Sequence, residues 1–232
     1  MYASDPLAPS LHAHLWQSCP DRPVLYFSPK SLQENYRRFA SGFDGLVTYV
    51  VKANASCLVL DNLALAGLTT FDVASPVEMQ TVRAAVPNAV LHYHNPVRSP
   101  IEIAAAKRFG IRSWSVDSRE ELDKLSGLPS GAEIAVRLHV PVAGAAYDFG
   151  LKFGAGPAQA AALLRCVKQR GLTPSLTFHP GTQCTDPAAW VQYIDVAYEV
   201  SQRAETALKR LNVGGGFTVW RERQAADLER VF

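Results

Sequence analysis

The sequence predicts an α/β protein of the (β/α)8 TIM-type barrel class, incomplete within its 232 residues. Three observations lead to this prediction: short β-branched or apolar runs alternate with stretches of helical spacing, seven such runs occur, and most of them end in a polar residue. Because only a crossover helix can join parallel neighbours, this alternation requires a parallel sheet. The chain also approaches the roughly 250 residues typical of such barrels.

The predicted strands cover residues 47–51, 70–73, 89–93, 112–116, 134–140, 175–178 and 211–213. The predicted helices between them cover residues 76–85, 100–109, 118–125, 157–170 and 188–208. A doubly wound open sheet fits the same alternation. We favour the barrel because polar residues end most of the strands, whereas an open sheet gathers its ligand groups at one switch point.

An eighth strand is not found, and the last stretch with helical spacing is 224–232. A closed barrel cannot omit one strand without exposing two sheet edges. We therefore expect a fragment that lacks the eighth strand, unless the apolar run at 24–27 takes another place in the fold. The expected division is an N-terminal extension at 1–22 and a truncated barrel domain at 23–232.

Composition narrows the class of function. The 23 basic and 21 acidic residues are spread along the chain, which leaves no basic stripe for nucleic acid. The start of the chain has no basic leader followed by an apolar run, and no 18 successive apolar residues occur, so we expect a cytoplasmic protein without a membrane span. Four widely spaced cysteines predict reduced thiols and no structural zinc.

Lys52 is the first candidate for chemistry, because it directly follows the first predicted strand. Its apolar neighbours Tyr49, Val50 and Val51 would desolvate the ammonium group and favour the neutral amine that Schiff-base chemistry needs. An ordinary lysine at a strand end fits the same residues.

Two loops are candidates for binding a phosphate group. Gly214, Gly215 and Gly216 follow the seventh predicted strand, where barrels commonly bind phosphate through main-chain N–H groups, although a glycine run is also typical of a flexible turn. His179 ends the sixth strand, so its ring can lie over a flat cofactor while the Thr182 hydroxyl reaches a phosphate oxygen. A single histidine at a strand end is more often structural.

Charged residues at other strand ends have two interpretations each. Asp72 and Glu78 flank the end of the second strand and would orient the lysine or bind a cation, but helix capping by Ser75 with Glu78 in the first turn explains this segment equally well. Arg137 lies in an apolar strand, where a buried guanidinium needs an anionic or carbonyl partner. A structural ion pair would satisfy that need as well.

Six short motifs, in their order, resemble the ornithine/diaminopimelate decarboxylase family. They are Tyr-Val-Val-Lys-Ala-Asn at 49–54, Phe-Asp-Val-Ala-Ser-Pro-Val-Glu at 71–78, Asn-Pro-Val-Arg at 95–98, Lys-Phe-Gly at 152–154, His-Pro-Gly-Thr at 179–182 and Val-Gly-Gly-Gly-Phe at 213–217. The resemblance runs from about Pro23 to the end of the chain. Within the family, residues 95–96 and 184–187 are closer to the ornithine decarboxylase branch than to the diaminopimelate branch.

The resemblance implies a barrel that binds pyridoxal 5'-phosphate (PLP), followed by a β-domain, in a homodimer with shared active sites. Lys52 would form the Schiff base with PLP, and His179 would stack on its pyridine ring. The resemblance implies that Thr182, Gly214, Gly215 and Gly216 bind the phosphate. It implies that Asp72, Glu78 and Arg137 surround the cofactor, and that Lys152 lies near the dimer interface.

The chain departs from the family pattern at a few positions. Pro180 stands where the family usually has valine, Thr182 replaces serine, and Arg98 replaces lysine, so the hydroxyl and the charge are kept. The Glu-Pro-Gly-Arg segment of the eighth strand and the cysteine, aspartate and tyrosine of the β-domain are absent. We therefore expect these residues alone to be inactive.

The expected function is PLP-dependent decarboxylation of a basic amino acid, most simply ornithine, giving putrescine, or lysine, in polyamine biosynthesis. Diaminopimelate decarboxylation is one alternative, and a non-catalytic PLP-binding or regulatory homologue is another. Amino-acid racemases share the barrel and the lysine position, but residues 184–187 do not resemble theirs. A metal-dependent barrel is a third interpretation, suggested only by His92, His94 and His139.

Overall fold

Seven parallel strands form one sheet in the computed structural model, which describes residues 11–142 and 152–218. The strands are β1 (Tyr49–Val50), β2 (Thr70–Asp72), β3 (Val90–Tyr93), β4 (Ser113–Val116), β5 (Glu133–Arg137), β6 (Thr173–Thr177) and β7 (Leu211–Asn212). Each pairs with the next along the chain, in the order β1-β2-β3-β4-β5-β6-β7. The predicted parallel sheet is confirmed, and the sequential order is that of a barrel, since a doubly wound sheet reverses its strand order.

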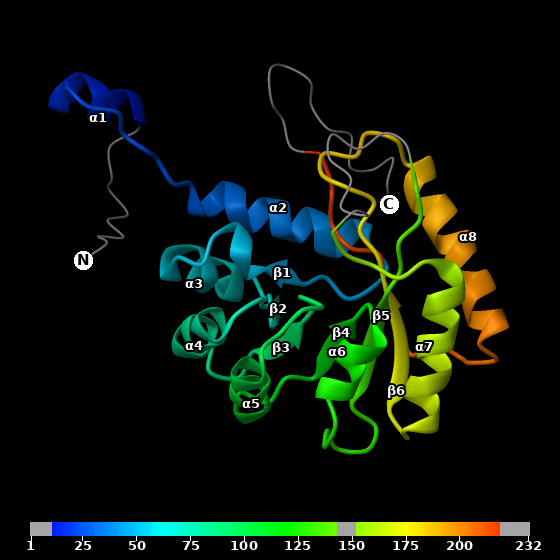
Figure 1. The fold of residues 1–232 in the computed structure, drawn as a ribbon. Coiled ribbons are helices and arrows are strands. Elements are labelled where there is room, and N and C mark those ends of the chain that lie inside the picture. The colour runs from blue at the N-terminus through cyan, green and yellow to red at the C-terminus, as the bar shows by residue number, and fades with distance from the viewer. Residues whose placement is uncertain (1–10, 143–151, 219–232) are drawn as a thin grey trace.

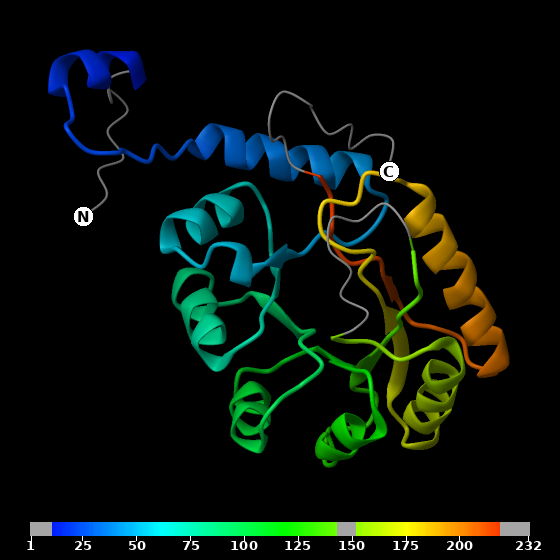
Figure 2. The same cartoon turned by 45° about the horizontal axis from the view of Figure 1, so that its top comes forward.

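Helices α3 to α8 surround the curved sheet on its outer face, as Figures 1 and 2 show. The helices of the described residues are α1 (Leu11–Ser18), α2 (Pro29–Gly42), α3 (Cys57–Leu65), α4 (Pro76–Ala85), α5 (Pro100–Arg108), α6 (Arg119–Lys124), α7 (Pro157–Gln169) and α8 (Ala188–Arg203). The five predicted helices, α4 to α8, are all present. The first three helices were not among them. In both views α1 stands away from the rest, joined to α2 by an extended segment.

Serine side chains start five of these helices. At the N-terminus of α2, α3, α4, α5 and α6, a serine side chain accepts a hydrogen bond from the main-chain N–H three residues further on. This contact satisfies one of the N–H groups that the first turn leaves free. The capping serines are Ser28, Ser56, Ser75, Ser99 and Ser118. Proline in the first turn of α2, α4, α5 and α7 fixes the entry of the chain.

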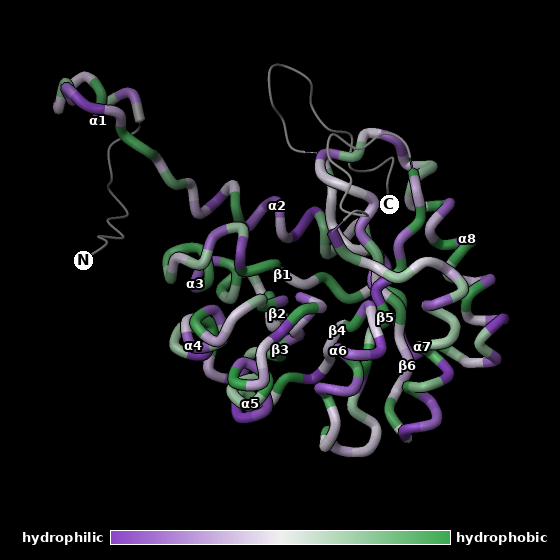
Figure 3. The backbone as a smooth tube through the Cα atoms, viewed as in Figure 1, coloured by the Kyte–Doolittle hydropathy of each residue, from purple (hydrophilic) through white to green (hydrophobic). Residues whose placement is uncertain are grey.

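The hydrophobic core lies between the sheet and these helices. Alternate strand residues point outward into it, and eight of them are at most 2% exposed: Phe71, Leu91, Tyr93, Trp114, Val116, Ile134, Val136 and Leu176. Apolar and polar residues alternate along α7 and α8 in Figure 3, because one side of each helix packs on the sheet and the other faces solvent. This layer positions the strand ends that carry the candidate site.

The inward-facing side chains of the sheet are largely polar. The parallel register sets Asp72 beside His92, His92 beside Ser113, and Ser113 beside Glu133. Glu133 accepts hydrogen bonds from Ser175 at 2.8 Å and from Arg210 at 2.9 Å. A barrel interior is more usually filled by layers of branched aliphatic residues. The inner face of this sheet is therefore a hydrogen-bonded polar layer.

The sheet does not close within the described residues, because β1 and β7 each pair with one neighbour only. This agrees with the expectation that an eighth strand is missing from the chain as given. The run at 24–27 forms no strand and is exposed, and the predicted helical stretch 224–232 lies outside the described residues. None of the helices in the described part of the chain is long and apolar enough to cross a membrane.

Candidate active site

Lys52 follows β1 directly, in a 3-10 turn at Val51–Ala53, so its predicted place at a strand end is confirmed. The side chain is exposed, while Val51 beside it is fully buried. The predicted desolvation by apolar neighbours is therefore wrong for the described part of the chain. The physical reason is the open edge: β1 has a neighbouring strand on one side only, so nothing described covers the end of the strand.

His179 lies just after β6, with its ring near two positive charges. Burial, then the charges of Arg137 and Lys52, lower the pKa of His179 from 6.5 to about 4. Nδ1 accepts a hydrogen bond from the Gly181 N–H at 3.1 Å. The ring is thus neutral near pH 7, and the structure brings three of the residues predicted from the sequence into one electrostatic neighbourhood.

The glycine loop at 214–216 packs against the loop that carries His179. Gly214 has a φ of +74°, and a Cβ there would lie 2.2 Å from the carbonyl oxygen of Phe178. Gly216 has a φ of +88°, and a Cβ there would lie 2.2 Å from the carbonyl oxygen of Gly181. Both positions therefore require glycine, for conformation and for space. The loop is a fixed turn rather than a flexible one.

The main-chain N–H groups of this loop have different roles. The Gly214 N–H donates to Asn212 Oδ1 at 2.8 Å, so it serves the loop itself. Gly215 lies beside the ring of His179, since a Cβ there would be 3.5 Å from Nε2. The donors that the loop offers to an anion are then the N–H groups of Gly215 and Gly216. Thr182, on the facing loop, is exposed.

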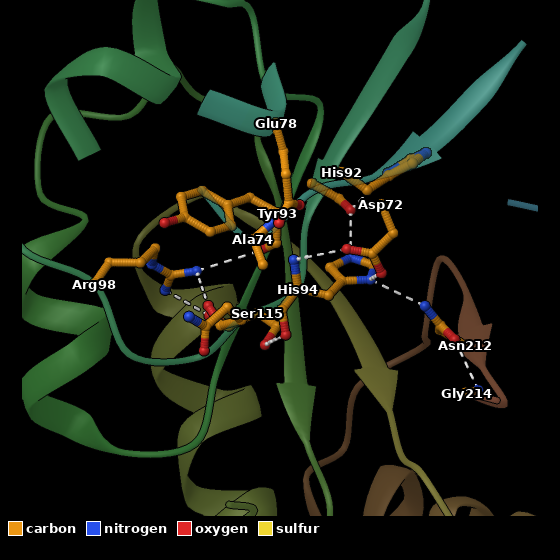
Figure 4. A network of polar contacts seen from close by, with 12 residues as sticks. Asp72, Ala74, Glu78, His92, Tyr93, His94, Arg98, Ser115, Asn212 and Gly214 are labelled. Carbon is orange, nitrogen blue, oxygen red and sulfur yellow. Dashed lines mark hydrogen bonds and ion pairs between the residues drawn. The ribbon is translucent and has the colours of Figure 1, made fainter. Parts of the chain in front are cut away.

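Asp72, at the end of β2, contacts His94, as Figure 4 shows. Its Oδ1 accepts from the His94 main-chain N–H at 3.3 Å, and its Oδ2 lies 3.2 Å from His94 Nδ1. The same Nδ1 lies 3.0 Å from Asn212 Nδ2. A continuous set of polar contacts therefore runs from β2 through the segment after β3 to β7 and the glycine loop.

Two histidines that suggested a metal site belong to this network instead. Ser113 Oγ lies 2.9 Å from His92 Nδ1 and 2.8 Å from His94 Nε2. The part of the chain that the structure describes holds no group of three or more potential metal ligands. Burial, then the interaction with the neighbouring His94, lower the pKa of His92 to about 4. A cavity of about 540 Å³ lies next to both histidines, between α2, β1 and β7.

Glu78 takes the capping role that the sequence left open. Its Oε2 accepts from the Ala74 N–H at 2.7 Å, and its own N–H donates to Ser75 Oγ at 3.2 Å. The hydrogen bonds found for Glu78 among the described residues are those at the start of α4. Arg98 is also structural: it is 2% exposed and donates to the carbonyl oxygens of Tyr93, Asn95 and Ser115.

Arg137 ends β5 and lies over the ring of Phe153, with its guanidinium carbon 5.0 Å from the ring centre. Burial lowers the pKa of Arg137, and the nearby carboxylates of Asp117 and then Asp72 oppose that shift. Asp117 also accepts from the Gly154 N–H at 3.1 Å. Lys152 Nζ lies 5.0 Å from the centre of the same Phe153 ring. Arg137 therefore has the anionic surroundings that its burial requires.

Three residues of this neighbourhood were not predicted to be functional: Asn212, His94 and Asp117. The signal for Asn212 is its position, an amide side chain two residues before the glycine run. Asp117 follows β4 directly, at the same end of the sheet as Lys52 and His179. His94 was noticed only as one of several scattered histidines. Its contacts depend on which strands pair, and this pairing cannot be predicted from a local sequence pattern.

Residues 30–231 match the family described as pyridoxal-dependent decarboxylase, pyridoxal binding domain. The fold and the strand-end site thus define a PLP-binding barrel, and the chain belongs to the pyridoxal-dependent decarboxylase family through this domain. It is 33% identical over 203 residues to the lysine/ornithine decarboxylase of Selenomonas ruminantium, covering 85% of this chain and 51% of that one. The chain therefore spans about half the length of this relative.

Solved structures agree with this family. A structure of a SrLDC mutant in complex with PLP has a TM-score of 0.85 and 29% identity, over 96% of this chain and 60% of that one. The lysine/ornithine decarboxylase of Vibrio vulnificus, complexed with putrescine, has a TM-score of 0.82 and 26% identity, over 95% of this chain and 59% of that one. The predicted family and barrel class are confirmed, and PLP is the cofactor of the family.

The residues of this site fit PLP. An amine at the end of β1, a neutral ring at the end of β6 and a glycine loop at the end of β7 would provide, in turn, a group for the aldehyde, a stacking surface and donors for the phosphate. The glycine loop is the specific observation, because a side chain at Gly214 or Gly216 would collide with the main chain that shapes it.

Proposed function

We propose that this chain is the cofactor-binding barrel of a decarboxylase that acts on a basic amino acid, ornithine or lysine, with Lys52 as the residue that binds PLP covalently. One observation carries the proposal: Lys52, His179 and the glycine loop lie at the same end of the sheet, and His179 is close enough to Lys52 for the lysine's charge to lower the pKa of His179. The names of the relatives support a basic amino acid as substrate.

Each protein group has a defined task in this reaction. Lys52 is exposed, so its amine would be accessible to the aldehyde of PLP. The neutral His179 ring would offer a stacking surface without adding a positive charge beside the cofactor. Gly215 and Gly216 would hold the phosphate through their N–H groups. PLP, when bound, supplies the electron sink that accepts the electron pair left behind by CO2.

Geometry is the main contribution of the barrel. The glycine loop would hold the phosphate end of PLP and Lys52 the aldehyde end, so that the bound cofactor keeps one orientation relative to the strand ends. Arg137 with Phe153, and Asp72 with His94, occupy the adjacent strand ends and form the wall of the site on the β2 to β5 side.

The assignment of Lys52 is tested by trapping the cofactor. Protein expressed from its full reading frame is incubated with PLP, reduced with borohydride and digested, and the modified peptide is mapped by mass spectrometry. The adduct is expected on Lys52 and absent from Lys52→Ala. Lys152 is the control: its Nζ lies 5.0 Å from the centre of the Phe153 ring, and it is expected to carry no adduct. An adduct on a different lysine would refute the assignment.

Measuring CO2 release separates this proposal from a non-catalytic PLP-binding homologue. The full-length protein is assayed with ornithine, lysine, arginine and diaminopimelate. Release from ornithine or lysine supports the proposal, release from diaminopimelate alone moves the substrate to the other branch, and a trapped adduct without CO2 favours the non-catalytic alternative.

The proposal has three further parts. Residues 23–232 are the barrel domain, the full-length protein is a cytoplasmic homodimer with shared active sites, and its reaction serves polyamine biosynthesis.

A further inference from the structure

His94 stands between the two parts of the site that the proposed function uses. Its side chain is 12% exposed and lies on the inner face of the sheet, at the end of β3. Both ring nitrogens have partners: Nδ1 lies between Asp72 and Asn212, and Nε2 contacts Ser113. Figure 4 shows this ring between the end of β2 and the glycine loop.

The orientation of Asn212 follows from an unambiguous donor. The Gly214 main-chain N–H can only donate, so the atom of Asn212 that faces it at 2.8 Å must be the amide oxygen. The NH2 group of Asn212 then faces His94 Nδ1 at 3.0 Å. His94 Nδ1 must accept this hydrogen bond, and a ring nitrogen can accept only when it carries no proton.

This requirement selects one tautomer of His94. With Nδ1 unprotonated, the ring proton is on Nε2, where Ser113 Oγ accepts it at 2.8 Å. Asp72 is served separately, since the His94 main-chain N–H donates to its Oδ1 at 3.3 Å. A proton on Nδ1 would instead point toward Asp72 Oδ2 at 3.2 Å and meet the NH2 hydrogens of Asn212. Nδ1 therefore serves Asn212 or Asp72, but not both at once.

We propose that His94 is a positioning residue: through Nδ1 it holds Asn212, and Asn212 in turn fixes the glycine loop in the shape that binds the phosphate of PLP. The inference rests on the proposed function. It assigns to His94 no contact with the cofactor or the substrate. Its effect passes through Asn212 to Gly214, where the geometry is tight enough that a small displacement changes the loop.

The test compares two ligands that differ only in the phosphate. Binding of PLP and of pyridoxal to the full-length protein is measured by isothermal titration, for the wild type and for three variants. His94→Ala removes both ring contacts. His94→Asn places an amide near the position of Nδ1, next to Asn212, and His94→Gln places one near Nε2, next to Ser113. All variants are checked for folding by circular dichroism and thermal unfolding.

Loss of one hydrogen bond predicts about tenfold weaker binding of PLP to His94→Ala, with binding of pyridoxal unchanged. His94→Asn is expected to recover most of this loss and His94→Gln to recover little. If His94→Ala does not fold, the Asn and Gln variants, which both keep an amide in the interior, carry the comparison. Asn212→Ala should show the same phosphate-specific loss, and combining it with His94→Ala should add nothing.

Three results would overturn the inference: equal loss for PLP and pyridoxal, no loss for either, or recovery by His94→Gln as complete as by His94→Asn. In each of these the wild type still binds PLP on Lys52, so the proposed function stands. Failure of the wild type to bind PLP at all would instead remove the proposed function, and the inference with it.

Discussion

Gly214→Ala is the sharpest available perturbation of the phosphate loop, because two costs can be worked out for it. The residue has a φ of +74°, and a left-handed conformation costs an alanine about 1–2 kcal/mol. The added Cβ would also lie 2.2 Å from the Phe178 carbonyl oxygen and 3.0 Å from the His179 Cα. Moving main chain to relieve such a contact costs about 1–3 kcal/mol. Together they predict a loss of about 2–5 kcal/mol in the free energy of unfolding.

Two matched variants separate these costs. Gly110 has nearly the same φ, +71°, with nothing within 4 Å of an added Cβ, so Gly110→Ala reports conformational strain alone. Gly215 has no left-handed φ, and its Cβ would meet His179 Nε2 at 3.5 Å, an ordinary contact. Gly215→Ala is therefore expected to change the unfolding free energy by less than about 1 kcal/mol.

Urea unfolding of the full-length protein, followed by intrinsic fluorescence, measures all three. The expected order of destabilisation is Gly214→Ala, then Gly110→Ala, then Gly215→Ala. PLP binding gives a second readout: the Gly214→Ala protein is expected to lose most of its affinity for PLP, whereas the Gly110→Ala protein is expected to bind PLP as tightly as the wild type. If Gly214→Ala and Gly110→Ala are equally stable, the contact with Phe178 is relieved without cost and the loop is not the fixed turn described above.

Two further predictions concern buried polar groups. Arg98→Met removes the donors to three main-chain carbonyls from a site that is 2% exposed, and should lower the free energy of unfolding by about 3–5 kcal/mol. The control is Arg108→Met on the surface of α5, which should leave the free energy of unfolding unchanged; equal urea midpoints for the two variants would contradict the prediction. Burial lowers the pKa of His92 from 6.5 to about 4, so between these pH values the unfolded chain binds a proton on His92 that the folded protein does not bind. The contribution of the neutral His92 to the free energy of unfolding is therefore complete above about pH 6.5 and is lost as the pH falls to about 4. Unfolding of His92→Gln should therefore depend less on pH across this window than that of the wild type, and parallel profiles would refute the burial argument.

Local sequence patterns were sufficient for the order of strands and for the site residues that follow them. A parallel strand places its C-terminal residue at a common end of the sheet whatever its neighbours are, so Lys52, Asp72 and His179 could be assigned to one site from position alone. The serine that precedes α4 was likewise recognisable from Ser75 and Glu78, three residues apart.

Properties that depend on contacts between distant segments could not be predicted. The exposure of Lys52 follows from the unpaired edge of β1, and the strand's own apolar residues gave no sign of it. His94 and Asn212 are 118 residues apart in sequence, and their contact exists only because β3 and β7 bring both to the inner face. The helix α3 was not predicted, although its buried residues Val59, Leu60 and Leu63 do have helical spacing.

The polar groups of the inner face satisfy one another. Glu133 accepts a hydrogen bond from Arg210, and Ser113 lies within hydrogen-bond distance of His92. Glu133, Ser113 and His92 are all buried, so these hydrogen bonds offset the cost of removing polar groups from water. Hydrogen bonds to neighbouring strands also restrict the orientation of these side chains. The side chains beneath the glycine loop can thus be held rigidly by the strands already present, which is the condition that positioning of Asn212 by His94 requires.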